Sequence, residues 1–247
     1  MSILRTVELT RSFGSLLATD CVSLDIQAGE RHAIIGPNGA GKSSFLHQLG
    51  GQLRPSSGQI YFKGSEITGL GPERICRLGI SRTFQTSNLF IRLSVMENVR
   101  LAVLSRRGNP LAPFVPLARL GALEARSLEI LEMVGLAGRK ADPVRNLSYG
   151  EQRQLEIAIA LATEPELLLL DEPTAGMSPA ETARMIEFVA RLPRTLTVLM
   201  IEHDMQVVFS LADRITVLHY GRLLATGTPG EITSNKDVQE IYLGTAH

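Results

Sequence analysis

The stretch GPNGAGKSS, from Gly36 to Ser44, combines three glycines, one lysine and two serines directly after the apolar run RHAII. Glycines leave backbone N–H groups free to surround phosphate oxygens, and the lysine adds a fixed positive charge. The stretch matches the pattern G-x-x-x-x-G-K-[ST], which a random chain of this length would contain roughly once in a hundred cases. We therefore predict a phosphate-binding loop between a strand and a helix.

Each residue type in this loop has its own predicted task. Lys42 reaches the terminal phosphates, and Ser43 ligates Mg²⁺ through its hydroxyl group. The helix that begins inside GKSSFLHQLGG adds the positive end of its dipole. We expect a nucleoside triphosphate here. The predicted contacts are Gly36, Pro37, Asn38, Gly39, Ala40, Gly41, Lys42, Ser43 and Ser44.

Two carboxylates end the apolar segment LLLLDEP, which runs from Leu167 to Pro173. An apolar strand would carry Asp171 to the carboxyl edge of a parallel sheet, where it holds Mg²⁺ through the water shell of the ion. Glu172 is then positioned to polarise an attacking water as a general base. A strand that ends in a solvated acidic turn would explain the segment alone, but the phosphate-binding loop favours the metal site.

His203 follows the next apolar segment, TLTVLMI, within the sequence IEHDM. A single histidine at a strand end is more often structural than catalytic. The same predicted sheet edge carries Asp171, however, and this shared edge favours a contact between His203 and the γ-phosphate.

The composition excludes several classes of protein. The 25 basic and 25 acidic residues give a formal net charge of zero, which argues against a dedicated nucleic-acid binder. Cys21 and Cys76 lie far apart, without the spacing of metal ligands, as expected for reduced thiols in the cytoplasm. The N-terminus lacks a signal-peptide core, and no apolar run is long enough for a membrane span.

Strand-like runs alternate with helical periodicity, which predicts an α/β fold with a mostly parallel sheet covered on both faces. Helical spacing dominates residues 92–163, apart from a proline-rich segment at 108–117 that we expect to form an exposed loop. The expected strands are CVSLDI, RHAII, LLLLDEP, TLTVLMI and RITVLHYG.

The segment LSYGEQ, from Leu147 to Gln152, supports two interpretations. Ser148 stands where a helix is expected to begin, so its hydroxyl and the first N–H groups of the helix would form an anion site. Ser148 with Glu151 three residues later is equally a capping box. The residues alone favour the capping box.

Five motifs in order resemble those of ABC-type ATPases: GPNGAGKSS, RTFQ (Arg82–Gln85), LSYGEQ, LLLLDEP and IEHD. The resemblance covers essentially the whole chain and is that of a single nucleotide-binding subunit of a transporter. It implies a P-loop NTPase core, an N-terminal antiparallel β region and an inserted α-helical signature subdomain. The chain would then be one ABC ATPase domain, with the catalytic core at 1–86 and 164–247 and the helical subdomain at about 87–163.

In the family that this chain resembles, two subunits pair head to tail, and each ATP lies between the P-loop of one and the signature helix of the other. The resemblance implies that Ser148 and Gly150 meet the γ-phosphate of ATP bound to the partner. It makes Gln85 a further catalytic residue and metal ligand, which relays the nucleotide state to membrane subunits. It also implies that Phe13 stacks on adenine, although a phenylalanine near a turn is equally typical of a core.

Two positions depart from the common family pattern: Tyr149 replaces the first signature glycine, and Ser178 stands where aspartate is frequent. Both departures resemble one branch, the ATPases of branched-chain and other hydrophobic amino acid uptake systems. RTFQTSNLFIRLSVMENV and the closing IYLG resemble the same branch.

The resemblance to this branch also implies a set of partners. They are a second ABC ATPase, identical or different, transmembrane permease subunits and, indirectly, an extracytoplasmic solute-binding protein. The chain would be cytoplasmic and attached to the inner face of the membrane, with no nucleic-acid partner. The alternatives are the ATPase of an exporter or of a lipopolysaccharide transport system, a soluble ABC ATPase without a transporter, and an unrelated P-loop kinase.

Overall fold

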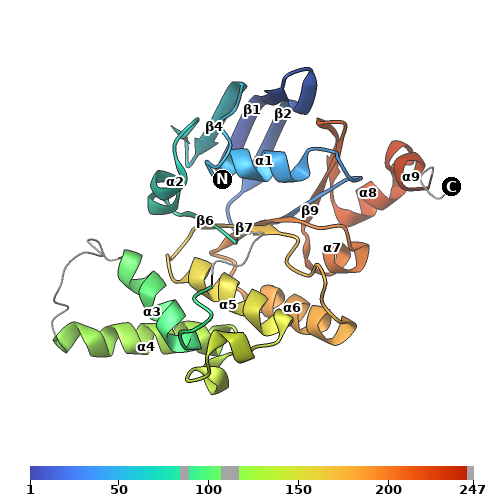
Figure 1. The fold of residues 1–247 in the computed structure, drawn as a ribbon. Helices are drawn as coiled ribbons and strands as arrows, with labels where there is room; N and C mark the ends of the chain where they lie inside the picture. Colours follow the sequence, from blue (N-terminus) through green and yellow to red (C-terminus); the bar gives the residue numbers. More distant parts are fainter. Residues whose placement is uncertain (84–88, 107–116, 244–247) are drawn as a thin grey trace.

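The computed structural model describes residues 1–83, 89–106 and 117–243. Within these ranges the chain forms two sheets, with one helix between them and further helices beyond the second sheet (Figure 1). Gln85 and all but the last residue of the proline-rich segment 108–117 lie outside the described residues, so the roles predicted for them stay predictions.

The first sheet is antiparallel and has the strand order β2-β1-β4-β5. Buried and exposed residues alternate along β2 from Val22 to Gln27, because only one face of this sheet covers the core. The expected N-terminal antiparallel region is thereby confirmed. Its strands are β1 (Ser2–Phe13), β2 (Leu16–Gln27), β4 (Ser57–Phe62) and β5 (Ser65–Glu66).

The second sheet has the order β10-β9-β3-β8-β7-β6, and β10 alone pairs antiparallel with its neighbour. This confirms the predicted mostly parallel sheet. Its strands are β3 (Arg31–Ile35), β6 (Ile80–Arg82), β7 (Leu167–Asp171), β8 (Thr197–Ile201), β9 (Arg214–His219) and β10 (Arg222–Gly227).

Strands β3, β7 and β8 are buried along their whole length because the parallel sheet is covered on both faces. In β7, Leu167 and Leu169 join the hydrophobic cluster that contains residues of α1 (Lys42–Leu49), between the two sheets. Leu168 and Leu170 join the cluster on the opposite face, under the other helices. Burial on both faces explains why these strands are uninterrupted apolar runs in the sequence.

The helices between residues 95 and 211 cover the face of the parallel sheet opposite to α1, whereas α2 lies on the side of α1, where its Ile75 joins the same cluster as α1 (Figure 1). Helices α3, α4 and α5 contact one another and fall within the segment predicted as a helical subdomain, whose boundaries stay a prediction. The helices after α1 are α2 (Pro72–Leu78), α3 (Val95–Arg106), α4 (Leu117–Met133), α5 (Tyr149–Leu161), α6 (Pro179–Arg191), α7 (Met205–Leu211), α8 (Pro229–Ser234) and α9 (Lys236–Leu243). No helix in the described ranges is long and apolar enough to cross a lipid bilayer.

The register of the parallel sheet brings three strand ends to one edge. Asp171 at the end of β7 pairs with Ile201 at the end of β8, and Ile34 of β3 pairs with the same Ile201. The segments that follow β3, β7 and β8 therefore leave the sheet together. Ligands of open α/β sheets bind at this carboxyl edge.

Candidate functional site

The loop between β3 and α1 depends on glycine at three positions for different reasons. A Cβ at Gly36 would lie 2.2 Å from the carbonyl oxygen of Leu218, and one at Gly41 would lie 2.0 Å from that of Ala18. Gly39 has open space around it among the described atoms, but its φ of 80° belongs to the left-handed region that favours glycine. The loop is therefore shaped by close backbone contacts on two sides and exposes its backbone at Gly39.

Lys42 folds back over this loop. Its Nζ donates to the carbonyl oxygens of Gly36, at 2.7 Å, and of Pro37, at 3.0 Å, and the residue is only 7% exposed. Burial lowers the pKa of Lys42, while the charges of Glu172 and Asp171 act in the opposite direction. A buried ammonium group is costly unless it is paired, so the phosphates of a nucleotide would supply counter-charge that fits this position.

The N-terminus of α1 receives no side-chain cap from any described residue. Its N-cap is Gly41 in the left-handed conformation, and its first turn holds no acidic residue but two partly exposed serines, Ser43 and Ser44. By contrast, α5, α6 and α8 all begin with a complete capping box. Free N–H groups and the helix dipole at α1 are what an anionic group binds.

Asp171 and Glu172 stand at the end of β7 in very different settings. Asp171 is buried and accepts a hydrogen bond from Arg82 Nη2 at 2.6 Å, an ion pair that the sequence reasoning missed. Glu172 has a φ of 46°, a conformation that costs a non-glycine residue about 1–3 kcal/mol. Its N–H donates to the carbonyl oxygen of Ile201 at 3.0 Å, which fixes it to the neighbouring strand end.

Glu202 links the segment after Glu172 to His203. The sequence analysis did not predict this residue as part of the site. It is fully buried, and its Oε1 accepts from the N–H of Thr174 at 3.1 Å and from its hydroxyl at 2.7 Å. Its Oε2 accepts from the N–H of His203 at 3.2 Å. The side chain of His203 itself is 60% exposed at the sheet edge. The available signal was a carboxylate directly before His203 at a predicted strand end.

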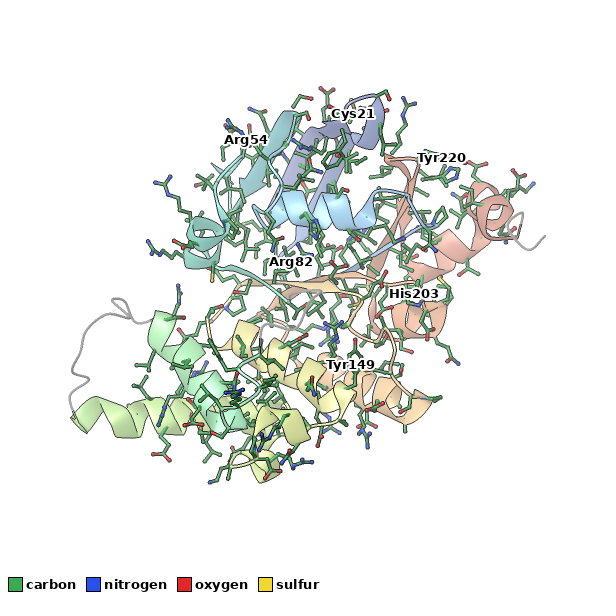
Figure 2. All side chains as sticks on the ribbon, in the orientation of Figure 1. Cys21, Arg54, Arg82, Tyr149, His203 and Tyr220 are labelled. Carbon is green, nitrogen blue, oxygen red and sulfur yellow. The ribbon has the colours of Figure 1, made fainter. Side chains whose placement is uncertain are left out.

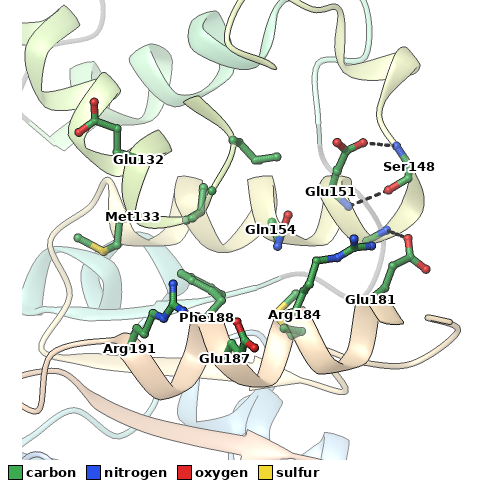
Figure 3. A pocket seen from close by; sticks show the side chains of 15 residues that line it. Glu132, Met133, Ser148, Glu151, Gln154, Glu181, Arg184, Glu187, Phe188 and Arg191 are labelled. Atoms are coloured by element: carbon green, nitrogen blue, oxygen red, sulfur yellow. Dashed lines mark hydrogen bonds and ion pairs between the residues drawn. The ribbon is translucent and has the colours of Figure 1, made fainter. Parts of the chain in front are cut away.

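At the start of α5 the structure contains the capping box that was one of the two interpretations. The N–H of Ser148 donates to Glu151 Oε2 at 2.7 Å, and the N–H of Glu151 donates to Ser148 Oγ at 3.3 Å. A carboxylate from another helix is also present, because the N–H of Gly150 donates to Glu181 Oε1 at 3.2 Å (Figure 3). The first turn of α5 thus already holds an anionic group.

The structure brings some predicted site residues together and keeps others apart. The loop Gly36–Ser44, Asp171, Glu172 and His203 share the carboxyl edge of the parallel sheet. Ser148 and Gly150 instead line a cleft of about 560 Å³ between α4, α5 and α6, and no residue of the loop Gly36–Ser44 lines it. Figure 2 shows Tyr149 on the side of the sheet opposite to α1.

Phe13, at the end of β1, is 48% exposed, so the alternative that it belongs to the core is wrong. The guanidinium group of Arg11 lies 4.6 Å from the centroid of its ring. The stacking of Phe13 on adenine stays a prediction.

Comparison with known proteins identifies similar chains over the full length. Residues 19–175 match the family described as ABC transporter, and residues 222–247 match the one described as branched-chain amino acid ATP-binding cassette transporter. The high-affinity branched-chain amino acid transport ATP-binding protein LivG of Salmonella typhimurium is 41% identical over 246 residues, which cover 96% of each chain.

Two solved structures are similar in fold as well. The ADP conformation of MJ1267, an ATP-binding cassette of an ABC transporter, has a TM-score of 0.88 at 31% identity and covers 99% of both chains. The dimeric ATP-binding cassette MJ0796, bound to ADP and Pi in a post-hydrolysis state, has a TM-score of 0.77 at 27% identity. That match covers 92% of this chain and 99% of the other.

The burial of Glu202 predicts a pH-dependent stability. Burial raises the pKa of Glu202 above its ordinary value of 4.5, against the hydrogen bonds from Thr174 and His203. The folded chain therefore binds this proton more tightly than the unfolded chain, and the resulting stability is lost as the pH rises through the raised pKa. We expect the unfolding free energy of the wild type, relative to Glu202→Gln, to fall as the pH rises above 4.5. Urea unfolding of both proteins at a series of pH values measures this difference in unfolding free energy.

Glu30 offers a matched control at the opposite edge of the sheet. It is also buried, but hydrogen bonds from His32 and Gln27 outweigh the effect of burial and hold the pKa of Glu30 below 4.5. The stability that Glu30 contributes is therefore lost only as the pH falls below that value. The difference between the wild type and Glu30→Gln should be constant from pH 4.5 to about 5.5, below the ordinary titration range of histidine, the residue type that Glu30 binds. A constant difference for Glu202→Gln in the same range would contradict the prediction.

Proposed function

The chain belongs to the ABC transporter family, whose ATP-binding proteins are ATPases coupled to transport, and from this premise we propose that it powers the uptake of branched-chain or other hydrophobic amino acids. The observation that carries the catalytic part is the uncapped N-terminus of α1 with the buried Lys42 beside it. This anion-binding end shares a sheet edge with two carboxylates and a histidine.

The proposed chemistry assigns one task to each group at this edge. Lys42 binds the β- and γ-phosphates, and Glu172 accepts a proton from the water that attacks the γ-phosphate. His203 contacts the γ-phosphate. Gln85, outside the described residues, senses the same group. Phe13, exposed at the end of β1, stacks on the adenine ring.

Mg²⁺ is part of the proposal through Ser43, Asp171 and Gln85. Among the described residues no cluster of three or more His, Cys, Asp or Glu side chains could hold a metal ion. That agrees with the usual mode of Mg²⁺ in nucleotide sites, where one or two protein oxygens, phosphates and water surround the ion. When bound, Mg²⁺ neutralises negative charge on the phosphates.

Ser148 and Gly150 act, in this proposal, on ATP bound to a second ATPase chain, identical or different. The cleft that they line contains no residue of the phosphate-binding loop Gly36–Ser44, which supports a task outside the chain's own nucleotide site. The structure of the cassette MJ0796 bound to ADP and Pi is dimeric, which supports the pairing of two such chains. ATP binding would close the pair around two nucleotides, and hydrolysis would reopen it.

The transport part of the proposal rests on the similarity to LivG of Salmonella typhimurium, a branched-chain amino acid transport ATP-binding protein. Permease subunits in the membrane would carry the solute, and an extracytoplasmic binding protein would deliver it. The chain would attach to these permeases at the inner face of the membrane and contact no solute itself.

Replacement of Glu172 by Gln tests the assigned general base. The variant should bind ATP normally, because the phosphates are held by other groups, but hydrolysis should fall by roughly 10²- to 10⁴-fold. Steady-state phosphate release together with calorimetric ATP binding measures both effects. Glu166→Gln is the control, since Glu166 lies just before β7 and pairs only with the exposed Lys63 among the described residues. Near-normal turnover of Glu172→Gln would remove Glu172 from the mechanism.

Replacement of Lys42 by Ala tests the nucleotide site itself. The change removes the charge that binds the β- and γ-phosphates, so calorimetry should detect no ATP binding. Lys63→Ala, which removes an exposed lysine of the same charge, should bind like the wild type. Unchanged affinity of Lys42→Ala would contradict the proposed site.

The transport function is tested by recovery of partners. A tagged chain purified from detergent-solubilised membranes of its native cell should bring two multi-span permeases and a second ATPase with glycine at the position of Tyr149. Ribosomal or DNA-bound partners without any membrane subunit would overturn the importer and leave the ATPase chemistry alone.

A further inference from the structure

One carboxylate joins the starts of two helices. Glu181 lies in the first turn of α6, where its Oε2 accepts from the N–H of Ser178 at 3.0 Å and from the Ser178 hydroxyl at 2.7 Å. Its Oε1 accepts from the N–H of Gly150 in the first turn of α5. Figure 3 shows this side chain reaching from α6 to the start of α5. Glu181 therefore caps its own helix and also binds the start of the signature helix.

The close approach depends on residue 150 being glycine and is supported by a second contact. A Cβ at Gly150 would lie 2.8 Å from Glu181 Oε1. Nearby, the ring of Tyr149 lies beside Gly176, where an added Cβ would be 3.6 Å from Tyr149 Cε1. The first turn of α6 and the loop before it thus both lie close to the start of α5. Tyr149 and Ser178, the two departures from the common family pattern, belong to this one contact.

The carboxylate stays charged at any physiological pH. Hydrogen bonds from Ser178, and further ones from Gly150 and Ser148, lower the pKa of Glu181 to about 2. The helix dipole of α5 also favours a negative charge at this end. A permanent anion therefore lies on the N–H of Gly150.

Gly150 is also the residue proposed above to meet the γ-phosphate on the partner chain, and with no side chain it can do so through its N–H group. One N–H donor forms one strong hydrogen bond, and two anions at one helix end repel each other. The phosphate of an incoming ATP therefore competes with Glu181 for Gly150. Glu151, whose carboxylate binds the N–H of Ser148, adds negative charge to the same turn.

We propose that Glu181 is a positioning residue that occupies the phosphate-binding end of the signature helix in the single chain and is displaced when two chains pair around ATP. The proposal rests on the proposed function, because it needs ATP at the partner's loop. Arg184 lines the same cleft. It lies three residues after Glu181 on α6, so the two side chains are neighbours on one helix face. Arg184 can therefore form an ion pair with the displaced carboxylate.

The test measures the ATP concentration that half-saturates pairing, in chains that carry Glu172→Gln so that ATP persists. The pairing partner is the second ATPase recovered from membranes, or the chain itself if none is recovered, and sedimentation velocity reports the pair. Glu181→Gln removes the charge but keeps the shape, so half-saturation should occur at roughly 3- to 10-fold lower ATP. Calorimetric affinity of the unpaired chain for ATP should not change, because its own loop is intact.

Glu187→Gln is the matched control. Glu187 lies on the same helix and lines the same cleft, but it pairs with Arg191 at 3.5 Å and has no hydrogen bond to Gly150 in the described structure. The ATP concentration that half-saturates pairing of Glu187→Gln should equal that of the parent chain, which carries Glu172→Gln alone.

Two other outcomes separate the claims. If the parent pairs normally but Glu181→Gln needs the same or a higher ATP concentration for half-saturation, the role of Glu181 is overturned and the head-to-tail function is not. Absence of ATP-dependent pairing in the parent overturns the head-to-tail function, and the role of Glu181 with it.

Discussion

The unsatisfied N-terminus of α1 is the feature around which the site is built. Its first N–H groups have no side-chain cap among the described residues, and the buried ammonium of Lys42 lies beside them. An uncapped helix end and a buried ammonium group each cost free energy, which a bound anion offsets. The carbonyl oxygens of Leu218 in β9 and of Ala18 in β2 lie so close to Gly36 and Gly41 that neither position has room for a Cβ.

The parallel sheet supplies the remaining groups because its strands are in register. The ends of β7 and β8 are directly paired. Asp171 at the end of β7, and Glu172 and His203 just beyond the strand ends, therefore stand at the same sheet edge as the phosphate-binding loop. Glu172 adopts a left-handed conformation there, and Glu202 ties the following segment to His203 through three hydrogen bonds. A strained residue beside a buried hydrogen-bonded carboxylate is typical of a functional edge.

The two helix ends with phosphate-binding potential are in opposite states. The first turn of α1 is open, whereas that of α5 is filled by Ser148, Glu151 and the carboxylate of Glu181. An open end binds its ligand directly. A filled end binds a phosphate only after the carboxylate that occupies it is displaced, which suits a step that also requires a second chain.

The sequence by itself determined the class of fold and most of the proposed catalytic edge. Loop glycines, apolar strands that end in carboxylates and helical periodicity are local patterns, and each depends on backbone geometry within a few residues. Ser148 was ambiguous because capping and phosphate binding use the same N–H groups and hydroxyl. Only the tertiary structure decided which distant side chains meet: Arg82 with Asp171, Glu202 with Thr174, and Glu181 with Gly150. These contacts join residues that are 28 to 89 positions apart in the sequence. Strand register and helix packing bring such residues together in space, and no local sequence pattern encodes either.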